Sequence, residues 1–124
     1  MRLTKLAVFM AVFLIMMSAL SMAARNKFGV ADVQQVTFTE PTQVGDVVLP
    51  KGEYKVQHTM EGENHIMIFT QSRKQQPATA RVKCQLEPLP EKASQNMVLY
   101  RHGDKDVHVL QQLVFRGDTA RHVF

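Results

Sequence analysis

The chain has a single cysteine, Cys84, among its 124 residues. One cysteine excludes an internal disulfide and any metal site that needs several cysteines. The excess of positive over negative charge is also small. The formal net charge is +4, and Arg2 and Lys5 at the N-terminus contribute to it. The other basic residues are scattered among Asp and Glu, so we expect no nucleic-acid partner and no anionic-membrane partner.

Known catalytic motifs are missing as well. The sequence has no G-x-S-x-G nucleophile elbow, no H-E-x-x-H zinc motif and no phosphate-binding glycine loop. Asp104/His108 and Asp118/His122 could each form a dyad of carboxylate and imidazole, but no convincing serine or cysteine nucleophile accompanies them in the sequence. We therefore expect a protein that is not an enzyme, with a small extracytoplasmic hydrolase as an alternative.

The first 23 residues have the pattern of a signal peptide. Arg2 and Lys5 precede an apolar run over 6–20, and small residues lead up to Ala23. Small side chains before the scissile bond suit signal peptidase, so we predict cleavage after Ala23 or after Ala24. The alternative is an uncleaved anchor, because a run of about 19 residues could just cross a bilayer. Either way the rest of the chain would be secreted or periplasmic, and cleavage would leave no stable membrane span.

Beyond a short lead-in over 24–32, the sequence predicts strands and turns. Polar residues alternate with β-branched and aromatic ones, and turn signals recur about every ten residues, a pattern typical of a small antiparallel β-sandwich or open barrel. We expect one all-β domain over 33–124 with seven or eight short strands. The expected strands are Val33–Thr39, Val44–Leu49, Glu53–Met60, His65–Gln71, Thr79–Leu86, Gln95–Arg101, Asp106–Phe115 and Thr119–Phe124.

The same alternation predicts which side chains form the core. Cys84 alternates with Val82 and Leu86, so we expect it to point inward as a small, inert hydrophobic residue. The predicted core consists of Val36, Phe38, Val48, Tyr54, Val56, Met67, Phe69, Val82, Leu86, Leu99, Val109, Leu113 and Phe115.

One turn is well defined by its residues. In Pro50-Lys51-Gly52 the proline fixes φ near about −65° and the glycine permits positive φ, as a tight turn requires. With its flanks the segment Val47–Tyr54 has the pattern V-x-L-P-x-G-x-Y, and F-x-G-D follows at 115–118. In these motifs the chain resembles small secreted all-β proteins of acidobacterial type, whose function is not known. The resemblance implies an exported all-β protein and transfers no catalytic residue.

The hairpin that turns at Gly62-Glu63 carries the strongest chemical signal. A loop of two residues there, or of four over Glu61–Asn64, pairs Met60 with His65 and His58 with Met67 and places all four side chains on one face, whereas a loop of three or five residues would not. Soft thioether sulfur favours Cu(I), so the sequence predicts that any bound metal is copper, held by these four residues. The competing interpretation is that this face belongs to the core, with methionines filling gaps and histidines at the rim.

Three further histidines carry weaker signals. His102 and His108 alternate with aspartates, as a row of ligands on one strand would, but Gly103-Asp104 predicts a turn and a solvated loop. His122 could join a metal site only if the fold brought it close, which the sequence does not reveal.

These features together predict an exported, non-catalytic binding or structural module of the cell envelope. We expect its partner to be an envelope protein or a small ligand, and the protein itself to be a monomer. No cofactor is expected unless the hairpin binds copper, in which case the alternative is a periplasmic copper-binding protein. The prediction follows from export, small size and the lack of catalytic motifs.

Overall fold

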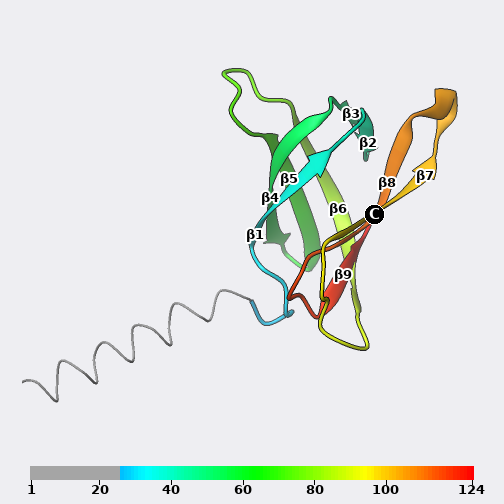
Figure 1. Ribbon diagram of the computed structural model, residues 1–124. Coiled ribbons are helices and arrows are strands. Elements are labelled where there is room, and N and C mark those ends of the chain that lie inside the picture. Colours follow the sequence, from blue (N-terminus) through cyan, green and yellow to red (C-terminus); the bar gives the residue numbers. More distant parts are fainter. Residues whose placement is uncertain (1–25) are drawn as a thin grey trace, which may run out of the picture.

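Strands make up nearly all regular structure in residues 26–124, the part of the chain that the computed structural model describes. The predicted leader and both predicted cleavage sites lie outside these residues. Within them, no helix is long and apolar enough to cross a membrane. The strands are β1 (Val33–Phe38), β2 (Thr42–Val44), β3 (Val47–Leu49), β4 (Gly52–Glu61), β5 (Asn64–Gln71), β6 (Thr79–Pro88), β7 (Met97–His102), β8 (His108–Val114) and β9 (Ala120–Val123) (Figure 1).

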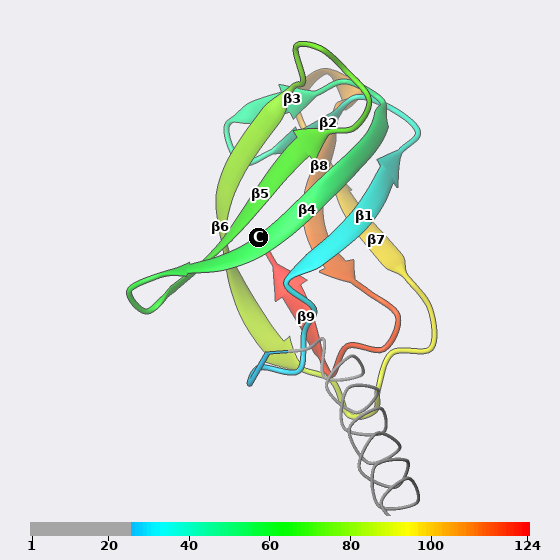
Figure 2. The ribbon, with the colours of Figure 1, turned by 90° about the vertical axis from the view of Figure 1, so that its left-hand side faces the viewer.

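The nine strands form one sheet that folds over the core without closing into a barrel. Their order is β1-β4-β5-β6-β9-β8-β2-β3, and β7 pairs with the other edge of β8. The sheet changes direction along β6, because Thr79–Cys84 pairs with β5 whereas Gln85–Pro88 pairs with β9. In Figure 2, β1, β4, β5 and β6 lie in front, and β7, β8 and β9 lie behind them. The predicted all-β class is confirmed.

The structure has nine strands where the sequence predicted seven or eight. The additional strand arises from a turn that the sequence analysis missed. Val44–Leu49 is not a single strand, because Gly45 and Asp46 separate β2 from β3 and let Val44 pair with Val47. Gly45 has a φ of 60°, a conformation that residues with a side chain adopt at a cost. β2 then runs parallel to β8, which ties this hairpin to the second half of the sheet.

The predicted turn between β3 and β4 is confirmed in its main features. Gly52 has a positive φ of 148°. The hydroxyl of Tyr54 donates a hydrogen bond of 2.6 Å to the carbonyl of Pro50, which closes the turn from inside. Leu49 and Tyr54, one on each strand, are both fully buried.

The core lies between the two halves of the folded sheet. The ring of Phe38 lies 5.4 Å from that of Tyr54 and 6.2 Å from that of Phe69, measured between centroids. The predicted core residues that the structure places in the central cluster are Val36, Phe38, Tyr54, Val56, Met67, Phe69, Leu113 and Phe115. Cys84 also belongs to this cluster, so its predicted inward orientation is confirmed.

The prediction that Val48 and Leu99 belong to the core is wrong. Val48 is 53% exposed and Leu99 is 40% exposed. Each lies in a run of consecutive apolar residues, where alternation cannot show which side chains face inward. Leu49 takes the inward position on β3, and the residues on either side of Leu99 pack against the core on β7.

A bulge in β8 accounts for a further core residue, Leu110. Leu99 pairs with Gln112 and Tyr100 pairs with Leu110, so Gln111 is extra in β8. The extra residue shifts the alternation, and both Leu110 and Leu113 therefore point into the core.

The lead-in before β1, residues 26–32, is fastened to the sheet. The backbone N–H of Thr119 donates to the carbonyl of Gly29, and the N–H of His58 donates to that of Asp32. Gly29 has a φ of 75°, and a Cβ placed on it would lie 1.8 Å from Oγ1 of Thr119. Only glycine fits this contact, which holds the lead-in against one end of the core.

Candidate metal centre

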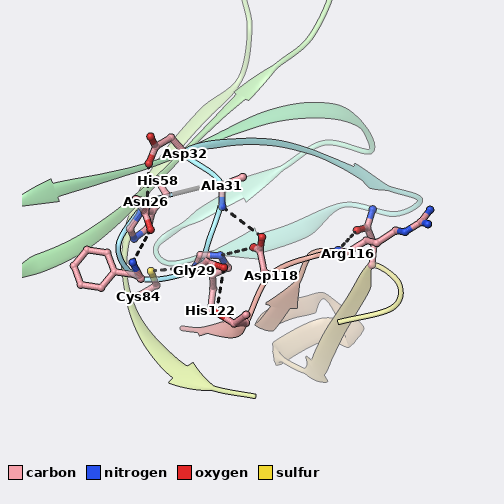
Figure 3. A network of polar contacts seen from close by, with 12 residues as sticks. Asn26, Gly29, Ala31, Asp32, His58, Cys84, Arg116, Asp118 and His122 are labelled. Carbon is pink, nitrogen blue, oxygen red and sulfur yellow. Dashed lines mark hydrogen bonds and ion pairs between the residues drawn. The ribbon is translucent and has the colours of Figure 1, made fainter. Parts of the chain in front are cut away.

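Three metal-ligating side chains meet at the end of the core that the lead-in covers. His58 is on β4, Cys84 on β6 and His122 on β9, and each is at most 7% exposed. One ligand atom from each residue lies within 4.8 Å of the others (Figure 3). Among residues 26–124 this is the group of histidine, cysteine and acidic side chains whose geometry could hold an ion.

Strand alternation directs all three side chains inward. His58 follows Tyr54 and Val56 on the buried face of β4. Cys84 follows Ala80 on the buried face of β6, and His122 follows Ala120 on that of β9. Because β6 pairs with β5 before residue 85 and with β9 after it, the fold in the sheet brings the side chains together.

His65 lies beside this group and connects it to the surface. Its Nδ1 is 3.1 Å from Nε2 of His58, so the two rings share a hydrogen bond, and it pairs directly with Cys84 across β5 and β6. His65 and Cys84 line a surface groove of about 500 Å³ together with Lys83 and Phe124. The buried group is therefore reachable from outside along His65.

A buried carboxylate lies behind His122. Nδ1 of His122 is 3.9 Å from the sulfur of Cys84, whereas Nε2 faces Oδ2 of Asp118 across 4.0 Å. Asp118 is fully buried, and its Oδ1 accepts a hydrogen bond from the backbone N–H of Ala31. A carboxylate behind an imidazole favours the N–H on that side, which leaves Nδ1 free to bind a metal next to Cys84.

Aromatic rings surround the centre on two sides. Phe28 of the lead-in contacts His65 edge-on, with 4.7 Å between centroids, and approaches His58 at 6.4 Å. Phe115 lies 5.7 Å from the ring of His122. A second groove, of about 570 Å³, runs along Phe28, His58 and the more exposed Met60.

Burial keeps the three side chains neutral at pH 7. Burial, followed by the neighbouring His58 and His65, lowers the pKa of His122 from 6.5 to about 4. Burial also lowers the pKa of His58, with a further decrease from His65 and an opposing increase from Asp32. The thiol of Cys84 has its pKa raised by burial from 9.0 to about 11.

These pKa values distinguish between two kinds of chemistry. The series Cys84, His122, Asp118 has the residue order of a nucleophilic triad, but a thiolate–imidazolium pair needs a lowered thiol pKa, whereas burial raises the pKa of Cys84. Here the thiol and the imidazole both remain uncharged. A metal ion suits this site, because neutral imidazole is already a ligand and the ion displaces the thiol proton on binding.

The hairpin that carries the predicted copper site has the predicted strand register. Met60 pairs with His65 and His58 pairs with Met67, so the register of the hairpin is as predicted. The two histidines are in contact. Met67 is buried in the hydrophobic cluster, as the competing interpretation of this face expected, whereas Met60 is 38% exposed and His58 is buried rather than at the rim. Copper binding by the four residues stays a prediction.

Cys84 and His122 are the two members of the buried group that the sequence analysis did not assign to a site. Cys84 was expected to be an inert core residue. Its predicted inward orientation was the one feature of the sequence that could have pointed to its place in the buried group. His122 is 38 residues away from it in the chain, and only the fold in β6 places the two side chains in contact. His102 and His108 lie elsewhere, on the β7–β8 hairpin around the turn Asp104–Asp106, and the loop is solvated as predicted.

Comparison of the chain with protein-family models, with curated proteins and with solved structures finds no match. The resemblance to secreted acidobacterial proteins therefore stays a prediction. The function is argued below from the geometry and chemistry of the site.

Proposed function

We propose that the protein is an exported, non-catalytic module that binds a transition metal through His58, Cys84 and His122. The observation that carries the proposal is the convergence of these three buried side chains, with ligand atoms within 4.8 Å of one another. Burying polar groups is unfavourable unless they gain partners. A bound ion would give all three side chains a strong common partner.

The distances suit an ion of the zinc or copper type. Metal–ligand bonds of about 2.0 Å to nitrogen and about 2.3 Å to sulfur place the ligands of a tetrahedral site about 3.3–3.8 Å apart. The separations here reach 4.8 Å, so the side chains would have to close by about one ångström. Nitrogen and sulfur donors favour zinc and copper over calcium or magnesium, which prefer oxygen.

Export supports the same proposal, because it would place the site where copper and zinc are taken up and buffered. The expectation of export rests on the predicted signal peptide at the N-terminus. The proposal replaces the two thioethers of the sequence-based copper site with a thiolate and an imidazole, and keeps His58. His65 hydrogen-bonds His58 and lies at the groove, where it would guide the ion in and hold the ring of His58 in place.

Metal titration of the exported, metal-free protein tests the proposal. We expect one Zn²⁺ or Cu⁺ per chain in competition with a coloured chelator, and a higher melting temperature on binding. Cys84→Ser conserves shape and should weaken binding by at least about 10-fold. The matched control is His102→Ala, which removes an exposed histidine from the β7–β8 hairpin and should leave the affinity unchanged.

Two results would contradict the proposal. One is the same affinity in the wild type and in Cys84→Ser, with both folded by circular dichroism. The other is reaction of Cys84 with iodoacetamide in the folded, metal-free protein together with turnover of a thioester or ester substrate. The second result would favour the hydrolase alternative instead.

A further inference from the structure

We infer that the bound ion is copper, held by the Cys84 thiolate as both Cu(II) and Cu(I), so that the centre carries single electrons. This inference rests on the proposed function above and adds the identity of the ion and a redox role. It depends on four features of the site: the donor set, the isolation of the cysteine, the residues around the ligands and the route to the surface.

The donor set is two imidazoles and one thiolate. Among the described residues, His58, Cys84 and His122 form the group with common ligand geometry, and His65 contacts His58 without joining the group. Structural zinc sites are usually closed by four protein ligands. Two histidines and one cysteine in a trigonal arrangement are the donor set of copper centres that transfer electrons.

The isolation of Cys84 protects a bond between copper(II) and sulfur. In solution, two thiolates reduce two Cu(II) ions to Cu(I) and form a disulfide, which destroys such a complex. Cys84 is the only cysteine of the chain and is 6% exposed in the fold. The chain therefore supplies no second thiolate to form a disulfide with it, and the thiolate stays available as a ligand in both oxidation states.

The surroundings hold the ligands in place. Asp118 lies behind His122 and is anchored by the N–H of Ala31, while Phe115 and Phe28 cover the imidazole rings. Such outer contacts fix ligand orientation and influence the reduction potential. Small rearrangement between oxidation states is the property that an electron carrier needs.

His65 supplies the route to the surface. It shares a hydrogen bond with His58 and lines the groove with Lys83 and Phe124, where a one-electron donor could approach. Metal binding releases the Cys84 proton to solvent. In each later cycle one electron passes from a one-electron donor to Cu(II), giving Cu(I), and Cu(I) then passes it to an oxidised one-electron acceptor, which restores Cu(II). No bond to carbon or hydrogen is made or broken.

Optical titration of the exported protein with Cu(II) tests the inference. We expect an intense visible absorption from charge transfer between thiolate and Cu(II), which saturates at one ion per chain. Ascorbate should remove the colour and ferricyanide should restore it over repeated cycles. Cys84→Ser should bind Cu(II) through its histidines without that colour, and His102→Ala should behave as the wild type.

Each of the following outcomes would refute one specific part of the inference. Copper that binds without colour, while Cys84 stays reactive toward a thiol reagent after unfolding, refutes the copper–thiolate bond and leaves metal binding intact. Colour lost after the first cycle with formation of a disulfide dimer refutes the electron carrier. Zinc that binds as tightly as copper refutes the identity of the ion. Failure to bind either metal refutes the proposed function itself.

Discussion

Two pairs of histidines in this fold approach each other closely on facing strands but differ in their surroundings. The rings of His58 and His65 lie 5.2 Å apart on β4 and β5, and those of His102 and His108 lie 5.8 Å apart on β7 and β8. The first pair lies beside the buried Cys84 and His122. The second lies beside solvent, with Nε2 of His108 3.3 Å from a carboxylate oxygen of the exposed Glu40.

The comparison shows that histidine spacing within a hairpin is not enough to make a metal site. Both pairs occupy facing strands, but only the first lies where the sheet folds over and a third strand, β9, brings another histidine close. A surface pair such as His108 and Glu40 contributes little to stability, because water and salt screen it. The predictions below test this difference.

The largest effect is expected from removing a ligand at the buried end. We expect His122→Ala to weaken metal binding by roughly 1,000-fold, which corresponds to about 4 kcal/mol. His108→Ala, at the other pair, should leave the affinity within about twofold of the wild type. Chelator competition measures both. Equal losses in the two variants would show that the two pairs are equivalent.

The pH dependence of stability is the next effect, and it concerns the metal-free protein. An unfolded histidine gains a proton near pH 6.5, whereas His122 in the fold resists protonation down to about pH 4. The unfolded state therefore binds more protons between these values, and the free energy of unfolding falls as the pH falls. The difference amounts to about 3 kcal/mol for His122, and no such loss occurs above pH 6.5.

Urea unfolding at pH 7, 5.5 and 4.5 measures this loss. The variant His122→Leu should show a smaller decrease over the same range, because it has no proton to gain. His102→Ala should keep the slope of the wild type. A slope that survives in His122→Leu would place the titrating group elsewhere.

The lead-in provides a third test, because it covers one pair of histidines and not the other. Gly29→Ala would place a methyl group against Oγ1 of Thr119 at a φ of 75°, and we expect a cost of about 2 kcal/mol. The amide of Ala31, which donates to Asp118, should then exchange faster with deuterium.

The matched control for Gly29→Ala is Gly62→Ala. Gly62 also has positive φ, at 60°, but a Cβ there meets nothing within 4 Å. It should therefore show the cost of backbone strain alone, with unchanged exchange at Ala31. Fast exchange at Ala31 in both variants would mean that the contact with Thr119 does not hold the lead-in.

The carboxylate behind His122 should have a smaller effect. Asp118→Asn keeps an oxygen for the N–H of Ala31 but changes the carboxylate oxygen that faces Nε2 of His122. We expect metal affinity to fall by about 10-fold, as is usual for groups that contact a ligand rather than the ion. Glu40→Gln, next to His108, is the matched change at the exposed pair and should have no effect on binding.

Much of the fold could be predicted from the sequence, because period-two alternation and turn residues are local signals. The register of β4 and β5 followed from the loop at Gly62-Glu63 alone. Errors arose where the local pattern is uninformative. Val48 and Leu99 lie in runs of apolar residues, which have no alternation to show which side chains face the core. The turn at Gly45 was overlooked because the apolar residues around it resemble one strand.

The site could be predicted only in part, for the same reason. His58 and His65 share a hairpin, so their contact follows from pairing on neighbouring strands. His122 reaches them through the fold in β6, a long-range feature without a local sequence pattern. Cys84 was correctly placed inside, but a buried thiol resembles any small core residue until its neighbours are known.

The smallest effect is expected from the methionine that the sequence placed in the copper site. Met67 pairs with His58 and is packed in the hydrophobic cluster, and in the proposed centre Cys84 supplies the soft donor. Met67→Leu conserves volume, so we expect a change in unfolding free energy below about 1.5 kcal/mol and in Cu(I) affinity below about threefold. Chelator competition on the folded variant measures the second. A loss of Cu(I) affinity as large as that of Cys84→Ser would show that the thioether is a ligand, and would restore the site predicted from the hairpin. A small loss of affinity would assign sulfur ligation to Cys84, which the fold in β6 brings to His122.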